Sequence, residues 1–453
     1  MANQFFKTPK FEPPGRPTAE DCSDALKKGL GRAGLWAESQ VLDPTQLARA
    51  FTSDLRYDRQ CEDSRASWLW MLMDTAGLGE VCEDALWQAP LAQKDAWNTE
   101  QLCELSLRFS LQGRDKFKLK LVRFVEDSPL DGDLTLGEKQ LMIAAGLDGF
   151  AIAARRHGRR LRERSWDWDD DSFIECAAEI FGSIKVSELL ENTDDDNIRR
   201  LNDQWRAYPT QSTAQRSQVR AQQQTLGVVL AAAKTNDRCT WFRGWGMHAD
   251  QDAVDQVYKR VLETQDQDEL SRLLRVFTRR ELPAVAPEVL EYCQSPHREL
   301  ALSALRALQG NADHRIRQLA LDLVATGDVE RGIELLTSNF ETGDEQTILQ
   351  ALIIPDEAEK RHGLLMACRS FLEGNQEASA DPLASMIYYF TPCSLCRAAT
   401  VKLLKDQGSV PAWMVNELRL DSEQGAREIY HPESELSTLI LDARMKQLRA
   451  ADC

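Results

Sequence analysis

The sequence has little that would place the chain in a membrane or outside the cell. No apolar run approaches the roughly 20 residues that a membrane-spanning helix needs, and the first residues, MANQFFKTPKFEPPGRPTAEDC, contain neither the apolar core nor the cleavage site of a signal peptide. The 11 cysteines are an odd number and most stand singly within helical patterns, unlike a disulfide framework. We therefore expect a cytoplasmic protein with reduced thiols and no membrane contact.

The sequence also lacks the motifs of common enzymes and the charge of nucleic-acid-binding proteins. It contains no Gly-x-x-x-x-Gly-Lys phosphate loop, no Gly-x-Ser-x-Gly elbow and no His-Glu-x-x-His metal motif. The formal charge of −17 repels nucleic-acid phosphates at long range. We expect no cofactor and no metal, and the absence of these motifs favours a protein that is not an enzyme.

Strand signals are nearly missing as well, and what the sequence does contain is helical periodicity. Apolar residues recur at intervals of three and four, in segments separated by short Gly, Pro, Asp or Asn stretches. This pattern predicts an all-α protein, an α-solenoid of stacked antiparallel helical hairpins. Whether the N-terminal part forms a distinct helical block or continues the same superhelix stays open.

One hairpin can be predicted in detail from the stretch ADHRIRQLALDLVATGD. Its apolar side chains fall on one helical face; they are Ile316, Leu319, Ala320, Leu323 and Val324. Gly327 supplies the left-handed residue that ends such a helix. The next helix, DVERGIELLTSN, follows at once, so the two must form an antiparallel hairpin. Such a hairpin needs neighbours on both sides to cover its apolar face.

A repeated frame surrounds several arginines in this half of the chain. Its best copy combines Asp313, Ile316, Arg317 and Ala320. The frame resembles the Asp-x-x-Val-Arg-x-x-Ala pattern of the HEAT-repeat superfamily, over about residues 250–450. The arginines at this position are Arg298, Arg317, Arg361, Arg397 and Arg427. The resemblance implies that they set the repeat spacing, and the alternative is a ladder that meets an acidic partner.

The resemblance extends, more loosely, to the rest of the chain. With the stretches YDRQCEDSRASWLWML and TPCSLCR, the chain is similar to a group of bacterial HEAT-containing proteins, a likeness that implies no activity.

Two polar stretches divide the chain into parts. Residues 1–20 predict a flexible arm because of FEPPGRP, and the Gln-rich residues 207–224 predict a linker or an exposed helix. These boundaries leave an N-terminal helical block at 21–206 and a HEAT-like repeat domain at 225–453.

The stretch TPCSLCRAATVKLL is the first candidate site. Thr391 is a plausible N-cap and Pro392 a suitable first helical residue, which places Cys393 and Cys396 in the first turns of a helix that ends before Gly408. A helix N-terminus lowers thiol pKa values, so a redox or regulatory dithiol is one interpretation. A metal site would need further ligands in a recognised spacing. We favour packing against a neighbouring repeat, because Cys396 stands where the repeats have a small apolar residue.

Two further stretches combine arginines with tryptophans. In ARRHGRRLRERSWDWDDD, six arginines precede two tryptophans, and the candidate patch consists of Arg155, Arg156, Arg159, Arg160, Trp166 and Trp168. The aspartates that follow favour a salt-bridged helix end over a protein-docking patch or a nucleic-acid site. In CTWFRGWGMHAD, Trp241 and Trp245 flank Arg243, and hinge packing is favoured over a binding hot spot.

These observations favour a non-enzymatic protein-interaction or assembly scaffold that uses the surface of a helical-repeat array. The expected partner is a protein of unknown identity, and the oligomeric state stays open. The first alternative is a thiol-dependent enzyme or redox sensor that works through Cys393 and Cys396. The second is a HEAT-like nucleic-acid binder, which the acidic composition disfavours.

Overall fold

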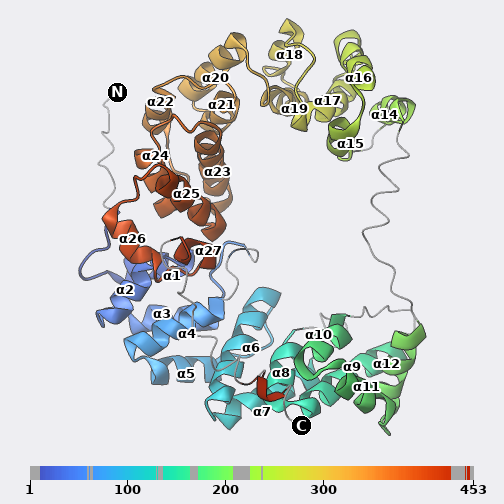
Figure 1. Ribbon diagram of the computed structural model, residues 1–453, viewed down its shortest axis with the longest axis vertical. Coiled ribbons are helices and arrows are strands. Elements are labelled where there is room, and N and C mark those ends of the chain that lie inside the picture. The colour runs from blue at the N-terminus through green and yellow to red at the C-terminus, as the bar shows by residue number, and fades with distance from the viewer. Residues whose placement is uncertain are drawn as a thin grey trace. The chain divides into compact units, whose positions relative to one another are not determined.

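The protein is all-α over the part of the chain that the structure describes. The computed structural model describes residues 11–58, 61, 65–128, 130, 136–163, 172–207, 225–235, 238–429, 444 and 446–448. These residues form α-helices, one 3-10 helix and connecting turns, with no strand among them (Figure 1). The predicted helical class is therefore confirmed. None of these helices has the length and hydropathy that a bilayer crossing requires.

The chain forms two compact units, and one of them joins distant parts of the sequence. Unit 1 comprises Met1–Thr210, Pro392–Ala398 and Pro411–Cys453, and unit 2 comprises Gln211–Thr391 and Ala399–Val410. The predicted linker at 207–224 lies almost entirely outside the described residues. The predicted domain limits therefore stay a prediction.

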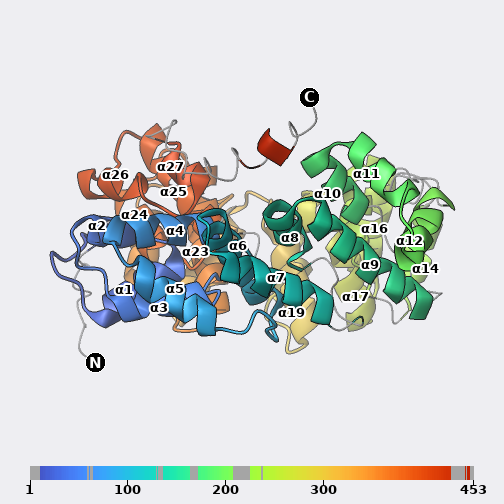
Figure 2. The same ribbon diagram turned by 90° about the horizontal axis from the view of Figure 1, so that it is seen from below.

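Within the described residues, unit 1 contains α1 to α12 together with α26 and α27. They are α1 (Ala19–Lys28), α2 (Arg32–Glu38), α3 (Pro44–Thr52), α4 (Arg65–Ala76), α5 (Gly79–Gln88), α6 (Ala96–Leu111), α7 (Asp115–Asp127), α8 (Glu138–Ala145), α9 (Leu147–Glu163), α10 (Ser172–Phe181), α11 (Ser183–Glu191), α12 (Asp196–Ala207), α26 (Ala412–Leu418) and α27 (Gln424–Arg427). Figures 1 and 2 show α8, α9 and α10 lying next to one another, which agrees with their contacts.

Unit 2 contains the helices between these two groups. They are α14 (Leu226–Ala233), α15 (Phe242–His248), α16 (Gln251–Glu263), α17 (Gln267–Leu274), the 3-10 helix η1 (Arg275–Arg279), α18 (Pro287–Tyr292), α19 (Arg298–Leu308), α20 (His314–Thr326), α21 (Val329–Leu336), α22 (Asp344–Ala351), α23 (Ala358–Gly374) and α24 (Asp381–Phe390). Helix α25 (Ser394–Asp406) begins among the residues grouped with unit 1 and ends among those of unit 2.

The predicted hairpin is formed by α20 and α21. Ile316, Ala320 and Val324 of its predicted apolar face are buried. Gly327 ends α20 with φ 95°, the left-handed conformation that glycine adopts without strain, as predicted. A Cβ atom on Gly332 of α21 would lie 2.5 Å from Val324 Cγ2, so the absence of a side chain there allows the two helices to approach closely.

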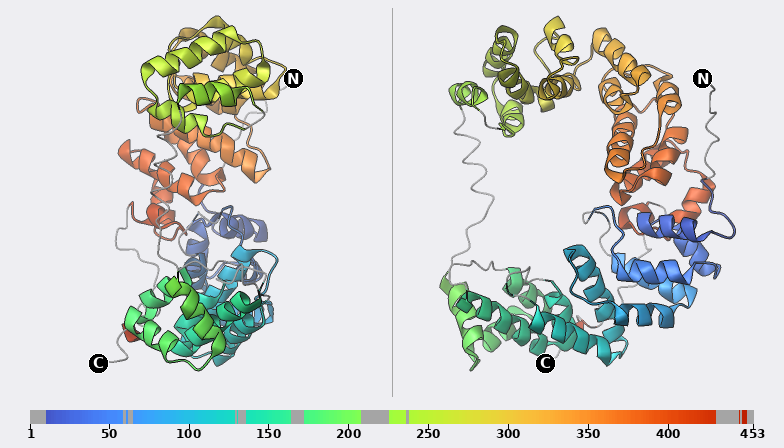
Figure 3. Two further views of the ribbon diagram at one scale, coloured as in Figure 1. Left: turned by 90° about the vertical axis from the view of Figure 1, so that its right-hand side faces the viewer. Right: turned by 180° about the vertical axis from the view of Figure 1, so that it is seen from behind.

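The hairpins of unit 2 pack in chain order. Helix α21 contacts α23, and α23 contacts α24, while α17 contacts α19 and η1 contacts both α15 and α19. Figure 1 and the right panel of Figure 3 show α20 to α24 following one another in sequence order. Each apolar face is thus covered by helices that are close neighbours in the sequence.

In unit 1 the C-terminal segment packs on the N-terminal helices. The indole nitrogen of Trp68 on α4 donates to the carbonyl of Leu420 at 2.8 Å, and Arg32 on α2 pairs with the buried Glu417 of α26 at 2.7 Å. A Cβ atom on Gly31 would lie 1.9 Å from the carbonyl oxygen of Glu417, so only glycine fits there. The described part of the N-terminal arm also packs on α2, because Trp36 Nε1 donates to a carbonyl of that arm at 3.1 Å.

Candidate functional site

Three cysteine side chains meet in the interior of unit 1. Cys61 donates to Cys393 across 3.5 Å between the sulfur atoms, and Cys396 completes the buried cluster, with Tyr57 packed against it. The exposed fractions of Cys61, Cys393 and Cys396 are 2%, 6% and 4%. The hydrogen bond with Cys393 and burial raise the pKa of Cys61 well above its usual range. The raised pKa of Cys61 and the burial of all three thiols oppose nucleophilic chemistry and favour packing.

The helix that carries these thiols begins later than the sequence predicts. Helix α25 starts at Ser394, and Thr391 is the C-cap of α24 instead of an N-cap. The backbone bonds define this start, because the N–H of Thr391 still bonds to the carbonyl of Ile387 in α24 at 2.9 Å, and the first bond of α25 runs from Arg397 N–H to the carbonyl of Cys393 at 3.2 Å. Cys393 therefore precedes the first helical residue. The predicted end before Gly408 is observed, since this glycine has φ 65°.

Arg397, one of the repeat arginines, joins the two ends of unit 1. Its guanidinium is fully buried and makes two bonds to the Asp421 carboxylate, at 2.9 and 2.8 Å. It also donates to the carbonyls of Lys28 and Gly29, at 2.9 and 3.2 Å, where α1 ends. Cations are favourable at the C-terminal end of a helix, and the bidentate carboxylate supplies the neutralising charge.

The other repeat arginines make contacts of several different kinds. Arg317 forms a bidentate pair with Asp344 at 2.6 and 2.8 Å, which ties α20 to the start of α22. Arg427 donates to carbonyls five and six residues before it, and Arg361 to carbonyls of the loop before α23. Arg298 is exposed. These contacts favour the structural interpretation at four positions, but they do not form one regular ladder.

The arginine-rich helix of unit 1 also uses its charges internally. Its members all lie on α9; they are Arg155, Arg156, Arg159 and Arg160. Arg155 pairs with Asp195 at 2.6 Å, and the buried Arg156 lies 3.5 Å from Glu138. Arg159 donates to a carbonyl of α7 at 3.3 Å. These bonds favour the structural interpretation of the stretch. The other two predicted members lie outside the described residues; they are Trp166 and Trp168.

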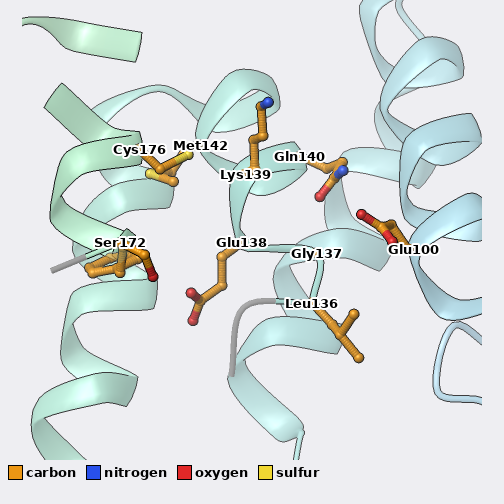
Figure 4. A pocket seen from close by; sticks show the side chains of 10 residues that line it. Glu100, Leu136, Gly137, Glu138, Lys139, Gln140, Met142, Ser172 and Cys176 are labelled. Carbon is orange, nitrogen blue, oxygen red and sulfur yellow. The ribbon is translucent and has the colours of Figure 1, made fainter. Parts of the chain in front are cut away.

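A small cavity of about 210 Å³ lies between α8 and α10, and Glu138, which Arg156 contacts, is one of its lining residues. Figure 4 shows Glu138 and Lys139 extending from α8 in opposite directions. Glu138 is buried and meets His157 Nε2 at 2.9 Å, with Arg156 on its other oxygen. Burial raises the pKa of Cys176, which also lines the cavity. A carboxylate held between an arginine and a histidine is a compensated buried charge, and it stabilises the packing of α8 on α9.

The aromatic stretch CTWFRGWGMHAD forms α15 and its start in unit 2. Trp241 and Trp245 are both half-buried, and Trp241 contacts the adjacent phenylalanine edge to face. A Cβ atom on Gly246 would lie 2.1 Å from the carbonyl of Val276, so α15 packs directly on η1. The two tryptophans are thus partly buried within unit 2. Arg243 lies on the same short helix as Trp245.

Arg243 is one of five arginines around a cavity of about 450 Å³. We call it the arginine pocket; its arginines are Arg238, Arg243, Arg272, Arg275 and Arg306. Burial lowers the pKa of Arg243, and nearby Arg306 and Arg275 lower it further because like charges repel. Two acids also line the pocket, Asp268 and Glu299. The lining therefore carries an excess of three positive charges in a chain of formal charge −17.

The sequence indicates part of this pocket, but our sequence analysis did not find it. Arg272 and Arg275 are three residues apart and so share one helical face. Arg243 was singled out with the tryptophans, not with other arginines. Arg306 comes from a separate element, α19. Nothing local in the sequence indicates that it lies near Arg243, Arg272 and Arg275.

Comparisons with known proteins add no assignment to these sites. No family model, no curated protein and no solved structure matches the chain. The fold and the sites therefore rest on the chain's own sequence and contacts. The chain is an all-helical protein built of many short helices.

Proposed function

We propose that the chain is a non-enzymatic protein-interaction scaffold, built as a HEAT-like α-solenoid. The observation that carries this proposal is the packing of unit 2 in chain order, from α17 through α19, α21 and α23 to α24. Helical arrays of this kind expose a long side-chain surface that is well suited to an extended protein partner. The acidic composition fits a protein partner better than a nucleic acid.

The array also exposes large apolar side chains to solvent. Ile353, in the loop after α22, is 78% exposed, and Met366 on α23 is 42% exposed. Apolar anchors that become buried against a partner supply much of the energy of protein interfaces. These two side chains are therefore the points where we expect a partner to be most sensitive to substitution.

The test is affinity capture of the tagged full-length chain from its own cells at about 0.15 M salt. We expect one protein to be retained in near-stoichiometric amount. The double variant Ile353→Ser with Met366→Ser should lose most of it, whereas the control Ile184→Ser, equally exposed at 74% in unit 1, should keep it. Failure to retain any protein above a tag-only control, or equal retention by the double variant, would contradict the proposal.

A further inference from the structure

We propose that the arginine pocket is a binding site for a small ligand that carries two linked phosphoryl groups, such as pyrophosphate. The pocket is assembled from α15, α17, η1 and α19; Figure 1 shows α15, α17 and α19 lying together, and η1 contacts all three. It is a half-open pocket on the surface of unit 2, and most of its lining residues are exposed. The inference does not depend on the scaffold function, because it concerns a different kind of ligand and different residues.

The free donors in the pocket point to an anion. The Nε atom of Arg243 is buried and has no hydrogen-bond partner among the described residues. Arg306 is exposed and forms no hydrogen bond or ion pair with the residues that the structure describes. Because protein atoms shield Arg243 Nε, the donors that an incoming acceptor can reach are those of the exposed Arg306. Guanidinium groups present a planar fork of donors that matches phosphoryl oxygens.

Other arginines of the pocket are already held in place by the chain. Arg272 Nε donates to the carbonyl of Ala233 at 2.7 Å, and Arg275 donates to the carbonyl of Arg238. Bonds of this kind fix the guanidinium groups before a ligand arrives, which reduces the entropy that binding must overcome. The pocket is therefore preorganised at two arginines and open at two others.

Charge and size select a linked phosphoryl ligand over a single carboxylate. The excess of three positive charges requires a ligand with a comparable negative charge, which pyrophosphate supplies near neutral pH. Glu299, 63% exposed at the rim, already lies 3.5 Å from Arg275, so any anionic ligand must compete with this carboxylate for the Arg275 donor. The volume of about 450 Å³ lies within the range of small-molecule sites.

The test is isothermal titration of the full-length chain with pyrophosphate at low salt, with citrate as a comparator of similar charge. We expect pyrophosphate to bind at least about tenfold more tightly than citrate, and its affinity to fall steeply as salt is raised. Arg306→Gln should weaken pyrophosphate binding by about tenfold or more. Glu299→Gln should strengthen it, because the competing rim carboxylate is gone. Binding of citrate as tightly as pyrophosphate would overturn the proposal.

A matched control is available on the same helix. Arg298 is exposed on α19 and does not line the pocket, so Arg298→Gln should bind pyrophosphate as the native chain does. Pyrophosphate should also raise the thermal unfolding midpoint of the native chain but not that of Arg306→Gln, which separates ligand loss from misfolding. Equal loss in both variants, no binding at millimolar pyrophosphate, or binding of a phosphoserine peptide alone would contradict a small-ligand site.

Discussion

At the scale of single residues, most of the charged groups that stand out in the sequence are used to hold the chain together. Arg397 and Arg317 each form a bidentate pair with an aspartate, and Arg156 lies against a buried glutamate. A buried cation without its partner is strongly destabilising, so these pairs have structural consequences. The sequence predicted a structural role from the HEAT resemblance, but it could not predict the partners, which lie 24 and 27 residues away in the sequence for Arg397 and Arg317.

The first prediction concerns Arg397. Replacing it with methionine leaves the Asp421 carboxylate buried without its counter-charge and removes the donor that Arg397 supplies to the carbonyl of Lys28 at the end of α1. We expect the unfolding free energy of unit 1 to fall by about 3–5 kcal/mol. Denaturant unfolding measures this change, with exposed Arg298→Met as a control expected to stay within about 0.5 kcal/mol of the native chain. A loss below about 1 kcal/mol for Arg397→Met would contradict the account.

The second prediction concerns the thiol cluster. Because Cys393 and Cys396 are buried, an alkylating reagent applied to the native protein should leave both unmodified. Denaturant should make both react quickly, as peptide mass spectrometry of the alkylated protein can follow. Rapid modification of either thiol at neutral pH in the folded chain would favour the thiol-dependent enzyme or sensor instead.

The third prediction concerns Glu104 on α6. Burial, with a smaller contribution from Glu100, raises the pKa of its carboxyl to about 7. The folded chain then holds a proton that the unfolded chain releases near pH 4.5, so stability should fall as pH rises from about 4.5 to about 7. Glu104→Gln should weaken this fall in stability. Relative to the native chain, the variant should therefore be more favoured at pH 8 than at pH 5.

Thermal unfolding midpoints at pH 5 and pH 8 measure the effect. The control Glu188→Gln changes an exposed glutamate on α11 and should keep the native difference between the two pH values. Suppose that the midpoints of Glu104→Gln differ between pH 5 and pH 8 by as much as those of the native chain. The Glu104 carboxyl then does not titrate in this range, which contradicts the buried environment described for it.

At the scale of helices, local rules predicted the elements well where their signals are local. The face of α20 and its end at Gly327 follow from periodicity and from glycine's freedom at positive φ. The start of α25 was predicted wrongly, because Thr391 is still bonded to the end of α24, and the first backbone bond of α25 goes to the carbonyl of Cys393. Contacts between distant helices have no local signal, and the close approach at Gly31 is one of them.

The fourth prediction concerns this approach. A methyl group at Gly31 would overlap the carbonyl of Glu417, a backbone atom that cannot move without shifting α26. We expect Gly31→Ala to destabilise unit 1 by about 1–3 kcal/mol. Gly79→Ala is the matched control, because nothing lies within 4 Å of a Cβ atom there. Equal unfolding midpoints for the two variants would show that α2 and α26 do not pack as described.

At the scale of the whole molecule, the sequence predicted helical hairpins but not which segments fold together. The segments 392–398 and 411–453 group with the N-terminal helices, and long-range bonds such as that from Trp68 to Leu420 explain why. The arginine pocket was missed for the same reason, since its residues come from three separate stretches of unit 2. Tertiary contacts of this kind depend on the packed structure, and no periodicity in one segment encodes them.

The central claim is that the hairpin array of unit 2 is a surface for a protein partner. Its most direct test is lysine-reactive cross-linking of the full-length chain in its own cells, followed by mass spectrometry. Lys259 on α16 and Lys360 on α23 are exposed reporters on the array, with side chains 76% and 70% exposed. The account predicts cross-links from one recurrent partner protein to these lysines. Recurrent cross-links that involve only unit 1 lysines, or none to another protein, would contradict it.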